Sequence, residues 1–192
     1  GAGKSGWRVR LGLAQPPDPM PRGIYLFGAV GRGKSMLMDM FFEALTIKDK
    51  RRVHFHDFML ETHAFIFEWR KTGSGDPIAP AARRIADTGR VLCFDEFQVT
   101  QIADAMILSR LFEHLFDRGV TVVATSNRKP SDLYLNGINR ELFLPFIRRL
   151  DDEVDVLELK SARDFRLERL TAAPVYYAPL GPEADAAMNA AF

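Results

Sequence analysis

Residues 23 to 35 read GIYLFGAVGRGKS, a short apolar stretch followed by the pattern G-x-x-x-x-G-K-S. The apolar stretch predicts a strand and residues 34–45 predict a helix, so the glycines lie between a strand and a helix N-terminus. In that context the backbone N–H groups of the loop and of the helix can together bind phosphate oxygens. The predicted nucleotide-binding residues are Gly28, Ala29, Val30, Gly31, Arg32, Gly33, Lys34, Ser35 and Met36.

Two side chains at the end of this loop have predicted roles of their own. Lys34 is expected to reach the β- and γ-phosphates, and Ser35 is expected to place its hydroxyl on Mg²⁺. The alternative is a glycine-rich turn that only caps a helix, and the flanking strand and helix disfavour it.

The composition indicates one globular domain with a net charge close to zero. The chain has 192 residues of which 47% are hydrophobic, enough to bury a full core. Its 26 basic and 25 acidic residues are well mixed, so no basic block indicates nucleic-acid or lipid-surface binding. No apolar run is long enough to cross a bilayer. The single cysteine, Cys93, excludes an intrachain disulfide, fits a reducing compartment, and is expected to be a small buried hydrophobe.

Beyond the loop, predicted strands and helices alternate. Strands are expected over 52–56, 91–94, 120–124 and 154–159. Helices are expected over 58–70, from 81 to a stop at Gly89, over 102–118, and over 139–149, where Pro145 would introduce a kink. Phe58 and Met59 are expected in the core. Together these elements predict an α/β fold, a three-layer structure around a parallel five-stranded sheet with right-handed crossovers.

A second motif, VLCFDE, occupies residues 91–96. An Asp at the carboxyl end of a buried strand can hold Mg²⁺, so Asp95 is predicted to share the metal with Ser35. Glu96 is placed to polarise an attacking water. The alternative, that both acids only cap the next turn, is disfavoured by the phosphate loop upstream.

A third motif, Ala124-Thr125-Ser126-Asn127, ends the strand predicted over 120–124. If that strand lies between the two motif strands, its terminal polar side chain would point at the γ-phosphate or the water. An Asx-type turn starting at Asn127 is a compatible alternative.

A cluster of His54, His56, Asp57 and His63 invites a metal interpretation. The two strand histidines would share a face, but a third ligand at strict spacing is missing. Core or interface histidines are therefore the favoured interpretation.

The three motifs, in this order and spacing, resemble the Walker A, Walker B and sensor 1 motifs of an AAA+ ATPase core. More narrowly, the chain resembles the ZapE family, bacterial cell-division-associated ATPases with mitochondrial relatives. The matching stretches are GAVGRGKSMLMDMFF from Gly28, RRVHFHDFM from Arg51, LCFDEFQVTQIADAMIL from Leu92, VVATSNRKPSDLYLNGINRELFLPFI from Val122, and Asp164-Phe165-Arg166.

The resemblance implies that ATP and Mg²⁺ are the cofactors and that Asn127 is sensor 1. It also implies that Arg140 contacts a neighbour's nucleotide as an arginine finger, with Arg148 and Arg149 as rivals. The implied function is ATP hydrolysis in a ring oligomer acting on a protein partner, in cell division or, in the mitochondrial relatives, in protein quality control. The implied location is the bacterial cytoplasm, at the division site, or the mitochondrion in a eukaryote.

Two other functions, a DNA helicase loader and a GTPase, are compatible with a phosphate-binding loop. A nucleotide-gated DNA helicase loader is the alternative that the near-neutral charge disfavours. A GTPase would need Asn-Lys-x-Asp, which the Asn127-Arg128-Lys129-Pro130 segment lacks.

The chain is expected to divide into an extension or linker over 1–22, an AAA+ core over 23–170, and the start of a lid over 171–192. That last segment is too short for a complete lid with a sensor 2 arginine, so the chain is expected to be a piece of a longer protein that binds nucleotide weakly.

Overall fold

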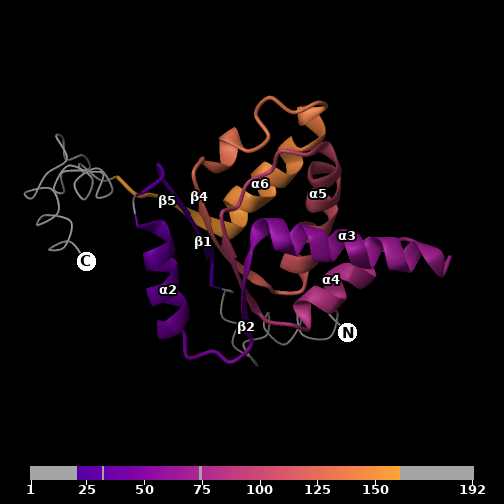
Figure 1. The fold of residues 1–192 in the computed structure, drawn as a ribbon, viewed down its shortest axis with the longest axis horizontal. Coiled ribbons are helices and arrows are strands. Elements are labelled where there is room, and N and C mark those ends of the chain that lie inside the picture. Colours follow the sequence, from indigo (N-terminus) through magenta and orange to yellow (C-terminus); the bar gives the residue numbers. More distant parts are fainter. Residues whose placement is uncertain (1–20, 32, 74, 161–192) are drawn as a thin grey trace, which may run out of the picture.

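The computed structural model describes residues 21–31, 33–73 and 75–160. Its centre is a five-stranded parallel sheet with the strand order β2-β3-β4-β1-β5 (Figure 1). The strands are β1 (Gly23–Phe27), β2 (Lys50–His54), β3 (Val91–Asp95), β4 (Thr121–Ser126) and β5 (Val154–Glu158). The predicted parallel five-stranded sheet is confirmed. The expected lid segment over 171–192, Asp164-Phe165-Arg166 and most of the expected extension lie outside the described residues.

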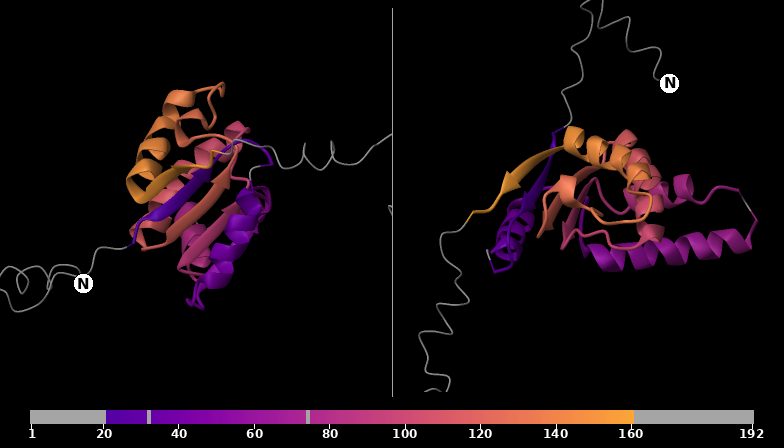
Figure 2. Two further views of the ribbon diagram at one scale, coloured as in Figure 1. Left: turned by 90° about the vertical axis from the view of Figure 1, so that its left-hand side faces the viewer. Right: turned by 90° about the horizontal axis from the view of Figure 1, so that it is seen from above.

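Helices cover both faces of this sheet and make the predicted three layers (Figure 2). One face carries α2 (Lys34–Ala44), whose Met38 packs with Cys93 and Val123. The other face carries the larger core, and it is covered by α3 (Phe55–Lys71), α4 (Ile78–Ala86), α5 (Ile102–Asp117) and α6 (Leu144–Glu153). Among the described residues, no helix combines the length and the apolar composition needed to cross a bilayer.

Aromatic rings dominate the larger core. Phe97, fully buried directly after the 91–96 motif, packs against Phe55 with ring centroids 4.1 Å apart and against Phe112 in an edge-to-face contact. Phe58 and Met59 are buried in the same core, as expected. The aromatic packing therefore anchors the chain immediately after Asp95 and Glu96.

Several predicted boundaries were wrong, most clearly in three segments. The strand expected over 52–56 ends at His54, because Phe55 turns into the core and begins α3, which places His56 on a helix. Helix α4 begins at Ile78 rather than at residue 81. The helix expected over 139–149 is divided: Asn139 has a φ of 55°, a 3-10 turn follows, and Pro145 lies in the first turn of α6. Proline is favoured in a first turn because its missing N–H is not needed there, so Pro145 starts a helix instead of kinking one.

Candidate nucleotide site

The three sequence motifs meet at one edge of the sheet. Parallel strands end on the same side of the sheet. β4 lies between β1 and β3, which is the position that residues 124–127 need to face a nucleotide bound at the other two motifs. The register pairs Phe27 of β1 with Ser126 of β4, and Phe94 of β3 with Ala124 of β4. The glycine-rich loop, Asp95 and Asn127 therefore leave three adjacent strands. In open parallel sheets such an edge is where ligands bind.

The loop after β1 has a backbone that only glycines accept easily. Gly31 and Gly33 have φ values of 80° and 81°. Gly28 is restricted by space instead, since a Cβ there would lie 2.7 Å from the carbonyl oxygen of Leu159. Its N–H donates a hydrogen bond of 3.2 Å to the carbonyl oxygen of Ser126. The loop is thus hydrogen-bonded to β4 at its first residue, and its backbone is left-handed at Gly31 and Gly33.

Helix α2 begins at Lys34, directly after the loop. The Lys34 Nζ donates to the carbonyl oxygens of Gly28 and Ala29, at 2.7 and 2.9 Å, so it lies back across the loop. Ser35 is exposed in the first helical turn, and in the described part of the chain no side chain caps this helix N-terminus. Exposed first-turn N–H groups beside a lysine favour an anionic ligand such as a phosphate.

Asp95 is the last residue of β3 and is only 6% exposed. Its carboxylate pairs with Arg52 of β2, from Nε to Oδ2 at 2.6 Å and from Nη2 to Oδ1 at 3.3 Å. Arg52 also pairs with Asp39 of α2. Sequence reasoning did not identify Arg52, although strand alternation from Cys93 and Asp95 to their register partners on β2 could have placed it on the same face.

Glu96 has a φ of 55°, which is unusual for a residue with a side chain, and it is exposed. Its N–H donates to Thr125 Oγ1 at 3.3 Å, and the next N–H, that of Phe97, donates to the Thr125 carbonyl at 2.7 Å. The left-handed turn separates the two acids: Asp95 stays buried against Arg52 while Glu96 turns toward solvent. Non-glycine residues in this conformation are concentrated at functional sites.

Thr125 and Ser126 are buried hydroxyl residues that tie β4 to the turn after β3. Ser126 Oγ donates to the Phe97 carbonyl at 2.7 Å and accepts from the Arg128 N–H at 3.2 Å. Sequence reasoning did not assign them this structural role, which two hydroxyls at the end of an otherwise apolar strand could have signalled. Asn127, the predicted sensor, follows them at the sheet edge and is exposed.

The three candidate arginine fingers have different surroundings. Arg140 lies in the 3-10 turn before α6, where Nη2 donates to the Ser131 carbonyl at 2.6 Å and the buried Nε has no hydrogen-bond partner in the described structure. Arg148 is exposed on α6. Arg149 is engaged within its own chain, by Asp117 at 3.1 Å and Glu153 at 2.8 Å.

The histidine cluster does not form a metal site. Within residues 21–31, 33–73 and 75–160, no group of three or more His, Cys, Asp or Glu side chains could hold an ion. His54 and His56 are exposed, and His63 is hydrogen-bonded to Asp104, with Nε2 and Oδ1 2.7 Å apart. Cys93 is fully buried, as expected, and burial raises the pKa of its thiol to about 11. The carboxylate of Asp95 and the hydroxyl of Ser35 are the hard oxygen donors that fit Mg²⁺.

Comparison with known proteins places this chain in a family. The family model of the AFG1-like ATPases matches residues 5–192. The chain is 46% identical to lactation elevated protein 1 homolog B of Danio rerio, over 92% of this chain and 37% of the relative. It is 45% identical to the cell division protein ZapE of Escherichia coli K12, over 88% of this chain and 44% of the relative. It therefore spans less than half the length of these relatives.

Solved structures agree on the fold. Domain III of the Thermotoga maritima replication initiation protein DnaA aligns with a TM-score of 0.54 and 18% identity, over 90% of this chain and 68% of that one. DnaI aligns with a TM-score of 0.51 and 13% identity, over 82% and 80%. These identities are low, so the likeness concerns the fold alone. Because the family model matches almost its whole length, the chain belongs to the AFG1-like ATPase family.

Proposed function

We propose that residues 23–170 contain the nucleotide-binding core of an ATPase that binds ATP with Mg²⁺ and hydrolyses it to ADP and phosphate. The observation that carries this proposal is the meeting of the glycine loop, Asp95-Glu96 and Asn127 at the ends of three adjacent strands. Structural roles alone would not require a buried acid, an exposed acid in a left-handed turn and an uncapped helix N-terminus at one edge.

Each residue then has a defined task. The loop N–H groups and Lys34 bind the phosphates, and Ser35 and Asp95 hold Mg²⁺, which supplies positive charge to the β- and γ-phosphates when bound. Glu96 accepts a proton from the attacking water as that water bonds to the γ-phosphorus and the bond to the bridging oxygen of ADP breaks. Asn127 orients the water or the γ-phosphate from the middle strand.

We also infer that the site is completed by Arg140 of a second copy, in a head-to-tail oligomer. The surroundings of Arg140 support this, because in the described structure its guanidinium makes one exposed hydrogen bond, from Nη2 to the Ser131 carbonyl, and no ion pair that would have to break. The loop that bears Arg140 also exposes three large apolar side chains, on Leu135, Ile138 and Leu142. Exposed apolar residues around a cation are typical of a surface that another protein covers. Arg149 is a weaker candidate, since its ion pairs would have to break first.

A protein partner in cell division is the proposed target of this activity, and the bacterial cytoplasm its location, since a close relative is named a cell division protein. Protein quality control remains the corresponding proposal for a mitochondrial setting. Pull-down of the Glu96→Gln variant with ATP, compared with ADP, would reveal a partner whose binding depends on the nucleotide. Recovery of the same amount of partner with ATP and with ADP would contradict a coupling between ATP turnover and partner binding.

The hydrolysis proposal is tested with the full-length protein by titrating a fluorescent ATP analogue and by measuring turnover per subunit against protein concentration. Glu96→Gln should bind the analogue like the parent and hydrolyse at least about 100-fold more slowly, because it loses only the base. Arg140→Ala should lose about 10³-fold in turnover and its dependence on concentration. Arg148→Ala is the matched control. If Arg148→Ala showed this loss of turnover and Arg140→Ala did not, the arginine finger would be Arg148 on α6.

A further inference from the structure

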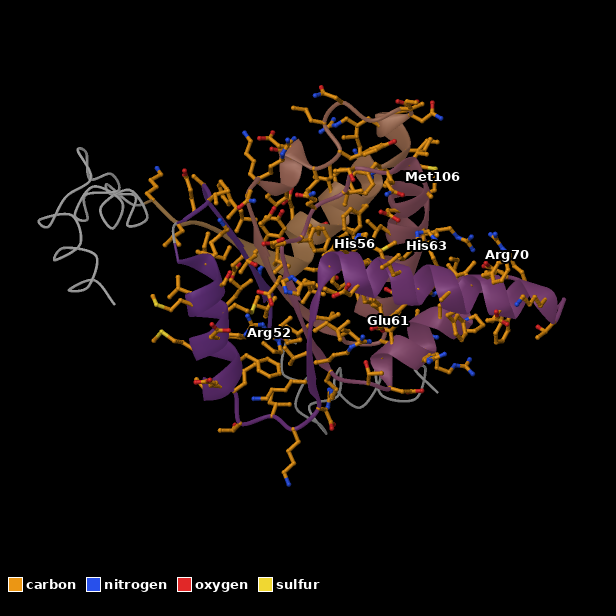
Figure 3. The ribbon with its side chains drawn as sticks, in the orientation of Figure 1. Arg52, His56, Glu61, His63, Arg70 and Met106 are labelled. Atoms are coloured by element: carbon orange, nitrogen blue, oxygen red, sulfur yellow. The ribbon has the colours of Figure 1, made fainter. Side chains whose placement is uncertain are left out.

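The edge strand β2 connects the nucleotide loop's helix to the strand that carries Asp95. Its side chains alternate between the two faces of the sheet. Arg52 is the register partner of Cys93, which packs against Met38 of α2, so Arg52 lies on the α2 side. Arg51 lies on the opposite face, where it pairs with Glu61 of α3. Figure 3 labels Arg52 between α2 and β2, and Glu61 beside α3. Two adjacent arginines thus enter different layers, and only one of them reaches the candidate site.

Arg52 contacts two acids that belong to different elements. It pairs with Asp95 through two nitrogens, and its Nη1 pairs with Asp39 of α2. The side chain of Arg52 is 25% exposed and that of Asp95 is 8% exposed, so their contact is largely shielded from water. The hydrogen bond to Asp95 raises the pKa of the Arg52 guanidinium above its ordinary value. A planar guanidinium fork fixes the orientation of a carboxylate as well as its charge.

The two oxygens of Asp95 are held unequally. Oδ2 accepts the short bond from Nε at 2.6 Å, while Oδ1 is 3.3 Å from Nη2, at the long limit of a hydrogen bond. Ser35 and Asp39 are four residues apart on α2, so they share one side of that helix. The backbone of Asp39, whose side chain pairs with Arg52, therefore lies about one helical turn, roughly 6 Å along the helix axis, beyond that of Ser35.

We propose that Arg52 is a positioning residue for the metal-binding carboxylate: it holds Asp95 through Oδ2 and leaves Oδ1 for Mg²⁺, while Asp39 holds and balances Arg52. This inference rests on the proposed nucleotide site. The three charges sum to a single negative charge, so Arg52 orients the carboxylate without neutralising the site. Outer residues that orient a metal ligand commonly change metal affinity by about 10- to 100-fold when they are removed.

A purely structural role for Arg52 predicts something different. Lys50, two residues earlier on the same face, already ties β2 to α2, because its Nζ donates to the carbonyls of Phe42 and Leu45 at 2.5 and 2.7 Å. If Arg52 only added to that link, its loss would weaken nucleotide binding equally with and without magnesium. If it positions Asp95, its loss should appear in the magnesium dependence.

The test measures binding of a fluorescent ATP analogue to the full-length protein, once in EDTA and once across a Mg²⁺ titration. Arg52→Gln should raise the half-saturating Mg²⁺ concentration about tenfold or more and leave the affinity in EDTA within about twofold. Arg51→Gln is the matched control, since it removes the same charge from the adjacent position of β2. It should behave like the parent.

Asp39→Asn covers the case in which Arg52→Gln fails to fold. It nearly preserves the side-chain volume but removes one of the two negative charges that Arg52 contacts, so Arg52 and Asp95 then sum to zero and the site loses its net negative charge. It should therefore raise the Mg²⁺ requirement in the same direction by a smaller factor. A Mg²⁺ requirement unchanged in the folded variants, or an equal loss of affinity in EDTA, would overturn the role of Arg52 while leaving the nucleotide site intact. A parent protein whose binding ignores Mg²⁺ would overturn both proposals.

Discussion

Removing the Ser126 hydroxyl should separate hydrolysis from nucleotide binding. Ser126 is 2% exposed, and its Oγ makes two hydrogen bonds, 2.7 Å to the Phe97 carbonyl and 3.2 Å from the Arg128 N–H. Each such bond between neutral groups contributes a net of about 1 kcal/mol, so Ser126→Ala should lower the free energy of unfolding by about 2 kcal/mol. For a chain of this size that corresponds to a fall in Tm of about 4 to 8 °C.

The functional effect follows from the position of the lost bond. Glu96 lies in the turn between Asp95 and Phe97, and Ser126 holds the far end of that turn. The nucleotide loop is held differently, by the backbone carbonyl of Ser126, which the substitution keeps. Affinity for the ATP analogue should therefore stay within about twofold of the parent, while turnover falls about tenfold or more because the base is misplaced.

Thermal unfolding followed by circular dichroism, the binding titration and the turnover assay together check this prediction. Ser109→Ala, half-buried on α5 away from the site, is the control and should change the free energy of unfolding by less than about 0.5 kcal/mol. A Tm within 1 °C or so of the parent, or a loss of affinity as large as the loss of turnover, would refute the assignment of Ser126 to the turn.

Two further predictions concern the loop and the buried thiol. Gly28→Ala should weaken nucleotide binding at least about tenfold, since its Cβ would meet the Leu159 carbonyl at 2.7 Å and the loop would have to move; parent-like affinity would show that the loop tolerates the shift. Cys93, whose pKa is raised to about 11, should stay protonated at pH 8 and react with a thiol reagent only after unfolding, as followed by absorbance in native and denaturing buffer. Rapid labelling of the folded protein would contradict its burial.

Much of the candidate site could be predicted because its parts are local. A glycine loop, a lysine and a serine in fixed order encode their own geometry, and acids after a buried apolar run mark the end of a parallel strand. The alternation of strands and helices restricted the fold to a parallel sheet with crossovers. The third motif was assigned a role on the condition that β4 lies between β1 and β3, and the structure meets that condition.

Boundaries were harder to predict where two local preferences competed. Residues 52–56 alternate like a strand, yet Phe55 gains more by entering the aromatic core, against Phe97, than by extending β2. Pro145 inside an apparent helix suggested a kink, whereas the left-handed Asn139 and a 3-10 turn bring the chain to a helix that starts just before it. Both outcomes depend on packing with residues distant in the chain, which a local pattern does not contain.

The sequence by itself determined the type of fold, because the alternation of strands and helices is a local pattern. It also singled out the glycine loop, Lys34, Ser35, Asp95, Glu96 and Asn127 as candidate site residues, because their motifs depend on local spacing. Only the tertiary structure decided what surrounds them. Arg52 meets Asp95 because β2 and β3 are neighbours in register, and Ser126 meets the turn after Asp95 because β4 lies beside β3. Such contacts join residues tens of positions apart in the chain, and their distances exist only once the sheet has formed and its strand order is set.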